Sequence, residues 1–229
     1  MNVKKTFFNW SSGKDSALSL YRLIKNPSYS VEHLVTSINK PLQRVTMHGL
    51  NVSLLKKQLS ALNLPYSFIE LPENPSHDEY TKIMTKKILK LKKDGYTHAA
   101  FGDIYLEDLR KHREEQLNKH KMNTVFPIWN EKPSDLIAEF FSLGFKAIVV
   151  CVDGQKLDSS FVGRAFDSSF LSDLPKGIDL CGENGEFHTF CYDGPIFLKA
   201  INFNIADKVE RTYTTKDKDF IFHFCELKG

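Results

Sequence analysis

The chain has 229 residues, of which 41% are hydrophobic and 26% are charged, and this composition argues against a disordered or fibrous protein. A chain of this length buries roughly 70–75% of its unfolded surface, so its fold needs no disulfide or metal. The net charge of +3 is too small to indicate nucleic acid binding. The longest apolar stretch, Phe145–Val152, is far shorter than the ~20 residues of a membrane span. Nucleic acids and membranes are therefore not expected partners.

The cysteines form neither a C-x-x-C pair nor a zinc-binding spacing. We interpret them as reduced thiols of a cytoplasmic protein; they are Cys151, Cys181, Cys191 and Cys225.

Strand-like and helix-like segments alternate over the first two thirds of the chain. In chain order they are strand Thr6–Trp10, helix Ser16–Lys25, strand Val31–Ile38, helix Leu54–Leu62, strand Tyr66–Leu71, helix Ser76–Lys93, strand Thr97–Phe101, helix Leu106–Lys119, strand Thr124–Trp129, helix Ser134–Leu143 and strand Phe145–Val152. This alternation is typical of βαβ units, so it predicts an α/β domain with a parallel sheet flanked by helices over residues 1–153.

The pattern changes after Asp153. Residues 154–195 are rich in Gly, Asp and Ser, with one short predicted helix at Phe161–Leu171. Predicted strands follow at Ile196–Ile205 and Phe220–Cys225, with no helical crossover between them. We therefore predict a smaller C-terminal α+β subdomain over residues 154–229.

The segment Ser11–Ser16 (Ser-Ser-Gly-Lys-Asp-Ser) lies directly between the first predicted strand and the first predicted helix. In a doubly wound sheet this junction faces the ligand crevice. Small residues, a helix N-terminus and the Lys14 ammonium together favour a phosphate. The segment matches neither a Walker A loop nor a dinucleotide-binding fingerprint. A helix cap without a ligand is the alternative interpretation.

Ser11–Ser16 resembles the pyrophosphate-binding loop, Ser-Gly-Gly-x-Asp-Ser, of the N-type ATP pyrophosphatases. Ser12 stands where that superfamily has its first glycine. The resemblance implies a Rossmann-like fold that cleaves ATP between its α- and β-phosphates. It also implies that ATP with Mg²⁺ binds at the loop residues, which are Ser11, Ser12, Gly13, Lys14, Asp15 and Ser16.

A second motif, Cys181–Phe190, is similar to the Cys-Gly-Glu-Gly-Gly-Glu-Tyr-Glu-Thr signature of the diphthine–ammonia ligase family. Three shorter segments agree with the same family in the same order: His48-Gly49, Phe101-Gly102-Asp103-Ile104 and Phe126-Pro127-Ile128-Trp129. The resemblance spans about residues 5–200. It implies an ATP-dependent ligase that adenylates a carboxylate and lets ammonia displace AMP. Asn184 replaces a glycine and His188 a glutamate of the signature, which points to an acceptor other than diphthine.

The resemblance and the residue types imply a set of roles. Glu183, Glu186 and Lys14 are the candidate catalytic residues; His48, Gly102, Asp103 and Arg110 are expected to join the loop in binding ATP; Asp15 and Asp103 are the candidate Mg²⁺ ligands; Asn184, Gly185, His188 and Thr189 are expected to contact the acceptor. The expected partners are ATP, ammonia and a protein-bound or small-molecule carboxylate.

Several alternatives stay open at this stage. Asp103 could cap the following helix, and the two glutamates could cap a turn. Other candidate functions are an ATP pyrophosphatase acting on a small carboxylic acid or a modified tRNA base, and a sensor that binds ATP or AMP without turnover. The oligomeric state is open as well, and a homodimer is one of the alternatives.

Overall fold

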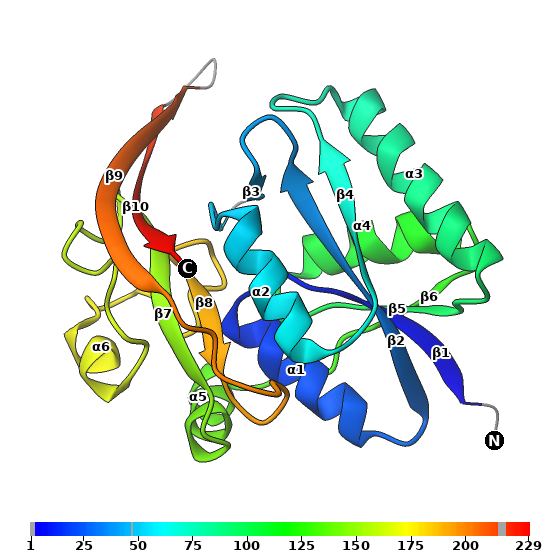
Figure 1. Ribbon diagram of the computed structural model, residues 1–229, viewed down its shortest axis with the longest axis horizontal. Coiled ribbons are helices and arrows are strands. Elements are labelled where there is room, and N and C mark those ends of the chain that lie inside the picture. Colours follow the sequence, from blue (N-terminus) through cyan, green and yellow to red (C-terminus); the bar gives the residue numbers. More distant parts are fainter. Residues whose placement is uncertain (1–2, 47, 215–218) are drawn as a thin grey trace.

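The computed structural model describes residues 3–46, 48–214 and 219–229. Its elements form two sheets that lie beside each other, sheet A in the N-terminal half and sheet B in the C-terminal part (Figure 1). In chain order the elements are β1 (Lys4–Asn9), α1 (Lys14–Lys25), β2 (Tyr29–Asn39), β3 (Arg44–Val45), α2 (Val52–Leu62), β4 (Tyr66–Leu71), α3 (His77–Lys93), β5 (His98–Ala100), α4 (Glu107–Asn118), β6 (Asn123–Val125), α5 (Pro133–Ser142), β7 (Lys146–Asp153), α6 (Ser168–Asp173), β8 (Phe187–Asp193), β9 (Asn204–Thr214) and β10 (Asp219–Lys228).

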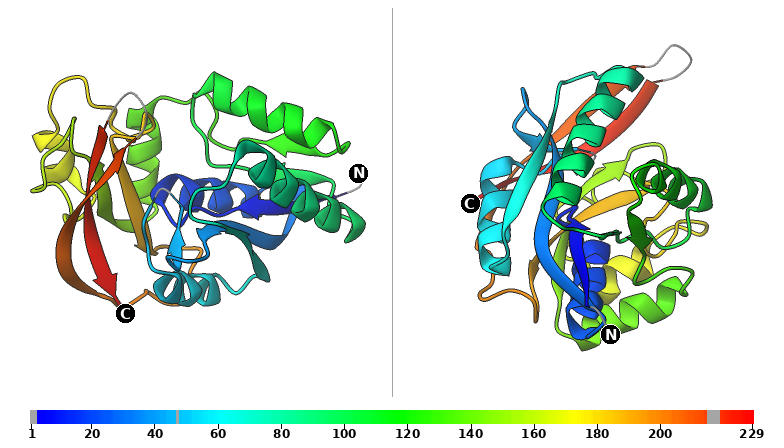
Figure 2. Two further views of the ribbon diagram at one scale, coloured as in Figure 1. Left: turned by 90° about the horizontal axis from the view of Figure 1, so that it is seen from above. Right: turned by 90° about the vertical axis from the view of Figure 1, so that its right-hand side faces the viewer.

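Sheet A has the strand order β3-β2-β1-β5-β6, and β4 pairs with β2. Its pairings are parallel except for the short β2–β3 hairpin. Successive residues of β1 point to opposite faces: Phe8 packs with α1 and α2, whereas Phe7 packs with α3 and α4. Helices therefore cover both faces of the sheet (Figure 2), which confirms the predicted α/β class.

The chain order of the strands reverses at β1. From β1 the chain proceeds through β2 to β4 on one side, and β5 and β6 lie on the other side. In open parallel sheets the ligand crevice forms at the carboxyl ends of the strands where this reversal occurs. The segment after β1 contains Ser11–Ser16 and the segment after β5 contains Gly102-Asp103, so both predicted motifs lie at the reversal point.

Sheet B is antiparallel, with the order β8-β7-β10-β9. Backbone and side-chain bonds fasten its edge strand β8 to the first half of the chain. The Cys191 amide donates to the Ser12 carbonyl over 2.9 Å. The buried Gln58 side chain of α2 donates to the carbonyls of both residues, over 3.0 and 2.6 Å. The Ser11–Ser16 segment is thus held between α2 and sheet B.

The structure corrects the position of one predicted strand. Phe145–Val152 was expected in the parallel sheet, but β7 pairs antiparallel with β8 and β10 in sheet B. Six consecutive residues of β7 are buried. An internal strand covered on both faces has the continuous apolar pattern that is usual in parallel sheets, so the pattern alone did not identify its sheet. The division at residue 153 stays a prediction.

Other boundaries also differ. The strand predicted at Ile196–Ile205 begins only at Asn204, because Leu198 donates its amide to Ala61 of α2 in an irregular connection. The strand predicted at Thr124–Trp129 ends at Val125, where Pro127 introduces a turn. The helix predicted at Phe161–Leu171 forms instead at Ser168–Asp173, after the Asp167 cap.

Strands β3 and β8 were not predicted from the sequence, and of β9 only Asn204 and Ile205 fall within a predicted strand. The four cysteines are buried free thiols, as predicted, and burial raises the pKa of Cys151 and of Cys181 to about 12. In the described part of the chain, no helix combines the length and apolarity needed to cross a membrane.

Candidate functional site

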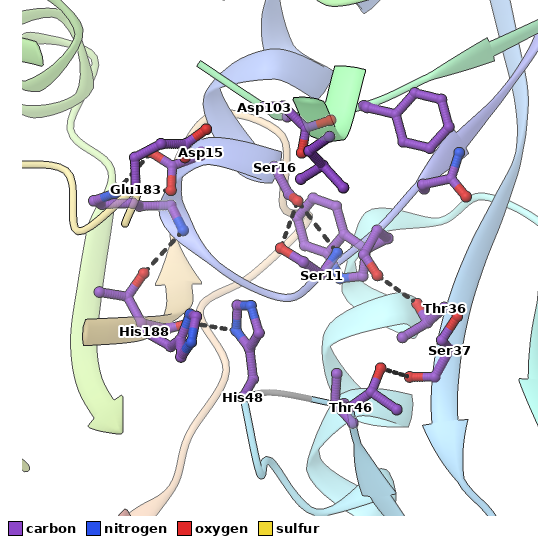
Figure 3. Close-up of a pocket in the computed structure, with 18 of the residues that line it drawn as sticks. Ser11, Asp15, Ser16, Thr36, Ser37, Thr46, His48, Asp103, Glu183 and His188 are labelled. Atoms are coloured by element: carbon purple, nitrogen blue, oxygen red, sulfur yellow. Dashed lines mark hydrogen bonds and ion pairs between the residues drawn. The ribbon is translucent and has the colours of Figure 1, made fainter. Parts of the chain in front are cut away.

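A cleft of about 340 Å³ lies between the carboxyl edge of sheet A and the beginning of β8 (Figure 3). Polar side chains from both halves of the chain converge on it. They include Ser11, Lys14, Asp15, Ser16, Thr36, Ser37, Thr46, His48, Asp103, Arg113, Glu183, His188 and Thr189. The cleft therefore unites the two motifs that the sequence places about 170 residues apart.

The first wall of the cleft is the loop that begins α1. The Ser16 Oγ lies 2.7 Å from the Ser11 Oγ and accepts the Ser11 amide over 3.2 Å, which closes the loop into a ring (Figure 3). Gly13 is the N-cap of α1 and makes no side-chain cap bond. The Lys14 amide donates to the Thr189 Oγ from sheet B over 3.1 Å. Because the helix lacks an ordinary side-chain cap, its N-terminus remains suited to an anion.

Ser12 adopts φ = 77°, in the left-handed region that favours glycine. This explains why the related loop has glycine at this place. The Ser12 side chain is fully buried, and its hydroxyl has no hydrogen-bond partner among the described residues. The surroundings nevertheless hold this conformation, because the Ser12 carbonyl accepts bonds from Gln58 and Cys191.

Ser12→Gly should therefore stabilise the protein. Relief of the left-handed strain contributes about 1 kcal/mol, and removal of the unpaired hydroxyl contributes about 1 kcal/mol more. The greater freedom of glycine in the unfolded chain offsets about 1 kcal/mol of this sum. The expected net gain of about 1 kcal/mol raises the melting temperature by roughly 2–4 °C. Ser12→Ala, which removes only the hydroxyl, is the control and should also gain about 1 kcal/mol, because strain relief and the unfolded-state freedom of glycine nearly cancel in Ser12→Gly. A melting temperature of Ser12→Gly at or below that of the unsubstituted protein would refute the prediction.

Lys14 and Asp15 form an ion pair at the base of the cleft. The Lys14 ammonium lies 2.7 and 2.8 Å from the two Asp15 oxygens and donates to the Cys181 carbonyl over 2.5 Å. The Lys14 side chain is only 4% exposed. Burial alone would lower the pKa of Lys14, but Asp15, Cys181 and Glu183 together outweigh this effect and raise the pKa above its ordinary value. Lys14 is therefore a fixed positive charge beside the loop.

The second wall follows β5. A Cβ on Gly102 would lie 3.0 Å from the Ser16 amide nitrogen, so glycine lets the two segments approach closely. Asp103 is 2.7 Å from the Arg113 Nε, and the Arg113 guanidinium stacks 4.3 Å from the Phe101 ring centroid. The N-cap of α4 is Leu106, so Asp103 does not serve as a helix cap.

Glu183 reaches the cleft from the second motif. It accepts the Ile104 amide over 2.8 Å, and this bond ties the second motif to the segment after β5. Burial raises the pKa of Glu183 to about 7, and the carboxylates of Asp15 and Asp103 contribute to the increase. A carboxyl group with this pKa exchanges a proton readily at neutral pH.

Two histidines lie against each other in the lining of the cleft, His48 after β3 and His188 on β8 (Figure 3). Their rings stack with centroids 4.7 Å apart and an angle of 29° between the planes. Since a carbonyl can only accept, the His48 Nδ1 donates to the Thr189 oxygen at 3.3 Å. Burial lowers the pKa of His48 to about 3 and that of His188 to about 4. Both rings are therefore neutral at physiological pH.

Asp15 and Asp103 fit the requirements of a magnesium site. Burial raises the pKa of both carboxyl groups, and Asp15 raises that of Asp103 further, while Lys14 and Arg113 oppose the increase. Bringing a cation between them would relieve this unfavourable charge. Within the described ranges no three His, Cys, Asp or Glu side chains converge on one point. Mg²⁺ usually takes only one or two carboxylates from the protein, with phosphates and water completing its shell.

Some predicted residues lie outside the cleft. Arg110 pairs with Glu114 at 2.7 Å and stacks over Trp129, so it contributes to the surface of α4. Ser12 and Gly13 belong to the loop but do not line the cleft, and neither does Gly185.

Asn184 and Glu186 are also outside the lining. The Asn184 amide donates to the Tyr105 hydroxyl over 3.1 Å and to Glu186 over 3.3 Å. The φ of Asn184 is not in the left-handed region, so its replacement of glycine does not strain the backbone. The Glu186 carboxyl is buried, with the Lys156 ammonium at 3.8 Å.

Sequence patterns did not indicate several polar residues of the cleft, among them Asn9, Thr36, Ser37 and Thr46. Thr36 and Ser37 lie near the carboxyl end of β2, beside β1, so the crevice rule for parallel sheets would have indicated them. Arg113, like Arg110, belongs to a helix with charges of both signs, so the sequence did not show which of the two faces the cleft.

The fold and the cleft together define a doubly wound α/β protein with a small-residue loop at the strand reversal, an arrangement typical of phosphate-binding proteins. Comparison with protein families is more specific. Residues 4–122 match the diphthamide synthase N-terminal domain, and residues 132–222 match the diphthamide synthase C-terminal domain. The chain belongs to the diphthamide synthase family, which confirms the resemblance found in the sequence.

The chain is also similar to proteins named diphthine–ammonia ligase. It is 32% identical to the protein of Bos taurus over 149 residues, which cover 62% of this chain and 55% of that protein. It is 31% identical to the Homo sapiens protein over 131 residues, covering 54% and 49%. The match to the Danio rerio protein is 22% identical over 186 residues, covering 79% and 67%. The chain thus spans about half the length of the mammalian relatives it matches.

Proposed function

We propose that the protein is an ATP-dependent ligase that joins ammonia to a carboxylate. The observation that carries the proposal is the convergence of the Ser11–Ser16 loop, Asp103 and Glu183 on one cleft. Such a site combines groups for holding a polyphosphate with a carboxyl group suited to proton transfer. The names of the relatives support this reaction class.

In the first step an acceptor carboxylate oxygen bonds to the α-phosphorus of ATP, and the bond to the β-phosphate oxygen breaks. Pyrophosphate leaves with the electron pair, and the acyl-adenylate remains. The N-terminus of α1 and the fixed charge of Lys14 stabilise the negative charge that grows on the pyrophosphate. Mg²⁺, held by Asp15 and Asp103, would neutralise phosphate charge when bound.

In the second step ammonia attacks the acyl carbon and AMP leaves. The nitrogen must lose a proton as the amide forms, and Glu183 is the best-placed acceptor. Its pKa near 7 keeps a large fraction ionised at neutral pH. The neutral rings of His48 and His188 border the same cleft without adding positive charge that would repel an ammonium ion.

The geometry favours Glu183 over Glu186 for this role. The two carboxylates lie on the same loop, but only Glu183 lines the cleft. Glu186 faces Lys156 and Asn184 instead. We assign Glu186 to the support of the loop.

The test is to measure AMP and pyrophosphate after incubating the protein with ATP, Mg²⁺, ammonium and candidate carboxylates. We expect both products to form together only when ammonium and an acceptor are present. Diphthine-containing elongation factor belongs in the panel, because the relatives' name refers to diphthine. ATP binding without either product under every condition would indicate a nucleotide sensor and would refute the proposal.

A further inference from the structure

A second cavity of about 260 Å³ lies between α3 and α4 on sheet A. Its floor consists of side chains from the strands and is apolar, with Phe7, Val35 and Ile69 as examples. Met84 and Ile88 of α3 form one wall, and α4 forms the other. We call this cavity the α3–α4 chamber. None of the predicted site residues belongs to it.

The α3–α4 chamber adjoins the cleft. The two cavities share wall residues that include Asn9, Met84, Phe101 and Arg113. A molecule with its body in the chamber could therefore present one end to the ATP-binding part of the cleft. This adjacency makes the chamber a candidate subsite for the second substrate.

The charges of the chamber have one sign. Among the described residues that line it there is no aspartate or glutamate, whereas Lys87 and Arg113 are present. Lys87 donates to the Ser67 hydroxyl and to the Phe68 carbonyl, and has no carboxylate partner within the described chain. The chamber therefore favours an apolar group of a ligand over a permanently charged cation. A cation would lose its hydration on entering, and no anion lines the chamber to compensate that loss.

Arg113 lies at the junction of the chamber and the cleft. Asp103 occupies the Nε and Nη2 edge of its guanidinium, at 2.7 and 3.1 Å. Asp103 therefore leaves the Nη1 hydrogens for another acceptor. A guanidinium at this place suits a carboxylate that enters from the apolar side.

We propose that the α3–α4 chamber binds the body of the acceptor, and that the acceptor is a carboxylic acid with an uncharged aromatic or branched hydrocarbon body. The Arg113 guanidinium would hold the carboxylate at the entrance to the cleft. This inference rests on the proposed ligase function for its chemistry, but the binding preference of the chamber can be measured without turnover.

The probes are two isosteric carboxylates, 5,5-dimethylhexanoate with a neutral tert-butyl end and γ-butyrobetaine with a trimethylammonium end. Calorimetry in the presence of a non-hydrolysable ATP analogue would give both affinities. We expect the neutral probe to bind at least about tenfold more tightly, since an unpaired cation loses its hydration in the chamber. Equal affinities, or a preference for the cationic probe, would overturn the inference.

Thr81→Glu tests the location, because Thr81 lines the chamber but not the cleft. The added carboxylate should weaken binding of 5,5-dimethylhexanoate and strengthen that of γ-butyrobetaine, while Thr81→Gln, the uncharged control, leaves the preference unchanged. Affinity for the ATP analogue should be the same in all three proteins. An unaltered preference in a folded Thr81→Glu variant would place the acceptor elsewhere.

Measurements of amide and AMP formation with the same two probes test the acceptor class and the ligase function independently. Amide formation with γ-butyrobetaine but not with the neutral probe would support a ligase and refute the proposed acceptor class. Selective binding of the neutral probe without AMP formation from any acceptor would support the chamber and refute the ligase.

Discussion

Glu183→Gln should lower acceptor-dependent AMP formation by roughly two to four orders of magnitude, the usual contribution of a positioned general base. Glutamine keeps the size of the side chain and can still accept the Ile104 amide bond. It cannot take a proton from the attacking nitrogen. ATP affinity, measured by calorimetry, should change little, because the charges that hold the phosphates are elsewhere.

The same substitution should stabilise the protein at high pH. The folded-state pKa of Glu183 is about 7 and its ordinary value is 4.5, so the folded protein binds this proton more tightly than the unfolded chain does. The stability gained from the proton is fully present below about pH 4.5 and is lost as the pH rises to about 7. Above pH 7 the ionised carboxylate lowers the free energy of unfolding by an amount on the order of 2 kcal/mol. This is less than the full pKa shift would give, because the side chain is partly exposed to solvent. Denaturant unfolding of both proteins at pH 5 and pH 8 measures the difference.

Glu186→Gln is the matched control for both measurements. It makes the same chemical change on the same loop, outside the cleft, and should retain most of the turnover. A large loss of turnover in Glu186→Gln, with Glu183→Gln nearly active, would exchange the roles that we assign to the two glutamates.

Asp15→Asn and Ser16→Ala should each weaken ATP binding in the presence of Mg²⁺ by at least about tenfold, or about 1.4 kcal/mol. Asp15 is a candidate metal ligand and the partner of the Lys14 ammonium. Ser16 holds the ring of the loop through its two contacts with Ser11. Calorimetry with ATP and Mg²⁺ gives the affinities, and unchanged values for both variants would remove the loop from the nucleotide site.

Asp15→Asn has a second consequence, because it leaves the buried Lys14 charge without its carboxylate. A fully buried pair broken in this way costs about 3–5 kcal/mol. The Asp15 side chain is 29% exposed, so we expect a smaller loss, about 2 kcal/mol of the free energy of unfolding measured in urea. Asp108→Asn, at an exposed position in the first turn of α4, is the control that should change neither stability nor ATP affinity.

The sequence predicted the first half of the fold well because local signals mark those elements. Ser76 and Glu79 form a capping box at the start of α3, and Asn63 adopts the left-handed conformation that ends α2. Strand β8 escaped prediction because its residues coincide with the second motif, whose polar and glycine residues resemble a loop. Its strand conformation depends on pairing with β7, which is a long-range contact.

The candidate site was predicted to a similar degree. The loop, Asp103, Glu183 and His188 were found because their residue types carry the expected chemistry and lie in motifs. Arg110 was chosen over Arg113, although only Arg113 faces the cleft. The two arginines are three positions apart on α4, and the choice between them depends on how the helix is rotated against sheet A. The short apolar pattern of α4, with Leu117 as its one buried residue, did not determine that rotation.

The loop after β1 is completed by residues from the far end of the sequence. Lys14 donates its amide to Thr189, Cys191 donates to Ser12, and Gln58 joins the carbonyls of Ser12 and Cys191. During synthesis, a nascent chain that already contains sheet A still lacks the β8 bonds that fix this loop. Because domains fold as their residues emerge from the ribosome, the loop can reach its final conformation only after β8 has been made, so the nucleotide site should be among the last parts of the molecule to mature.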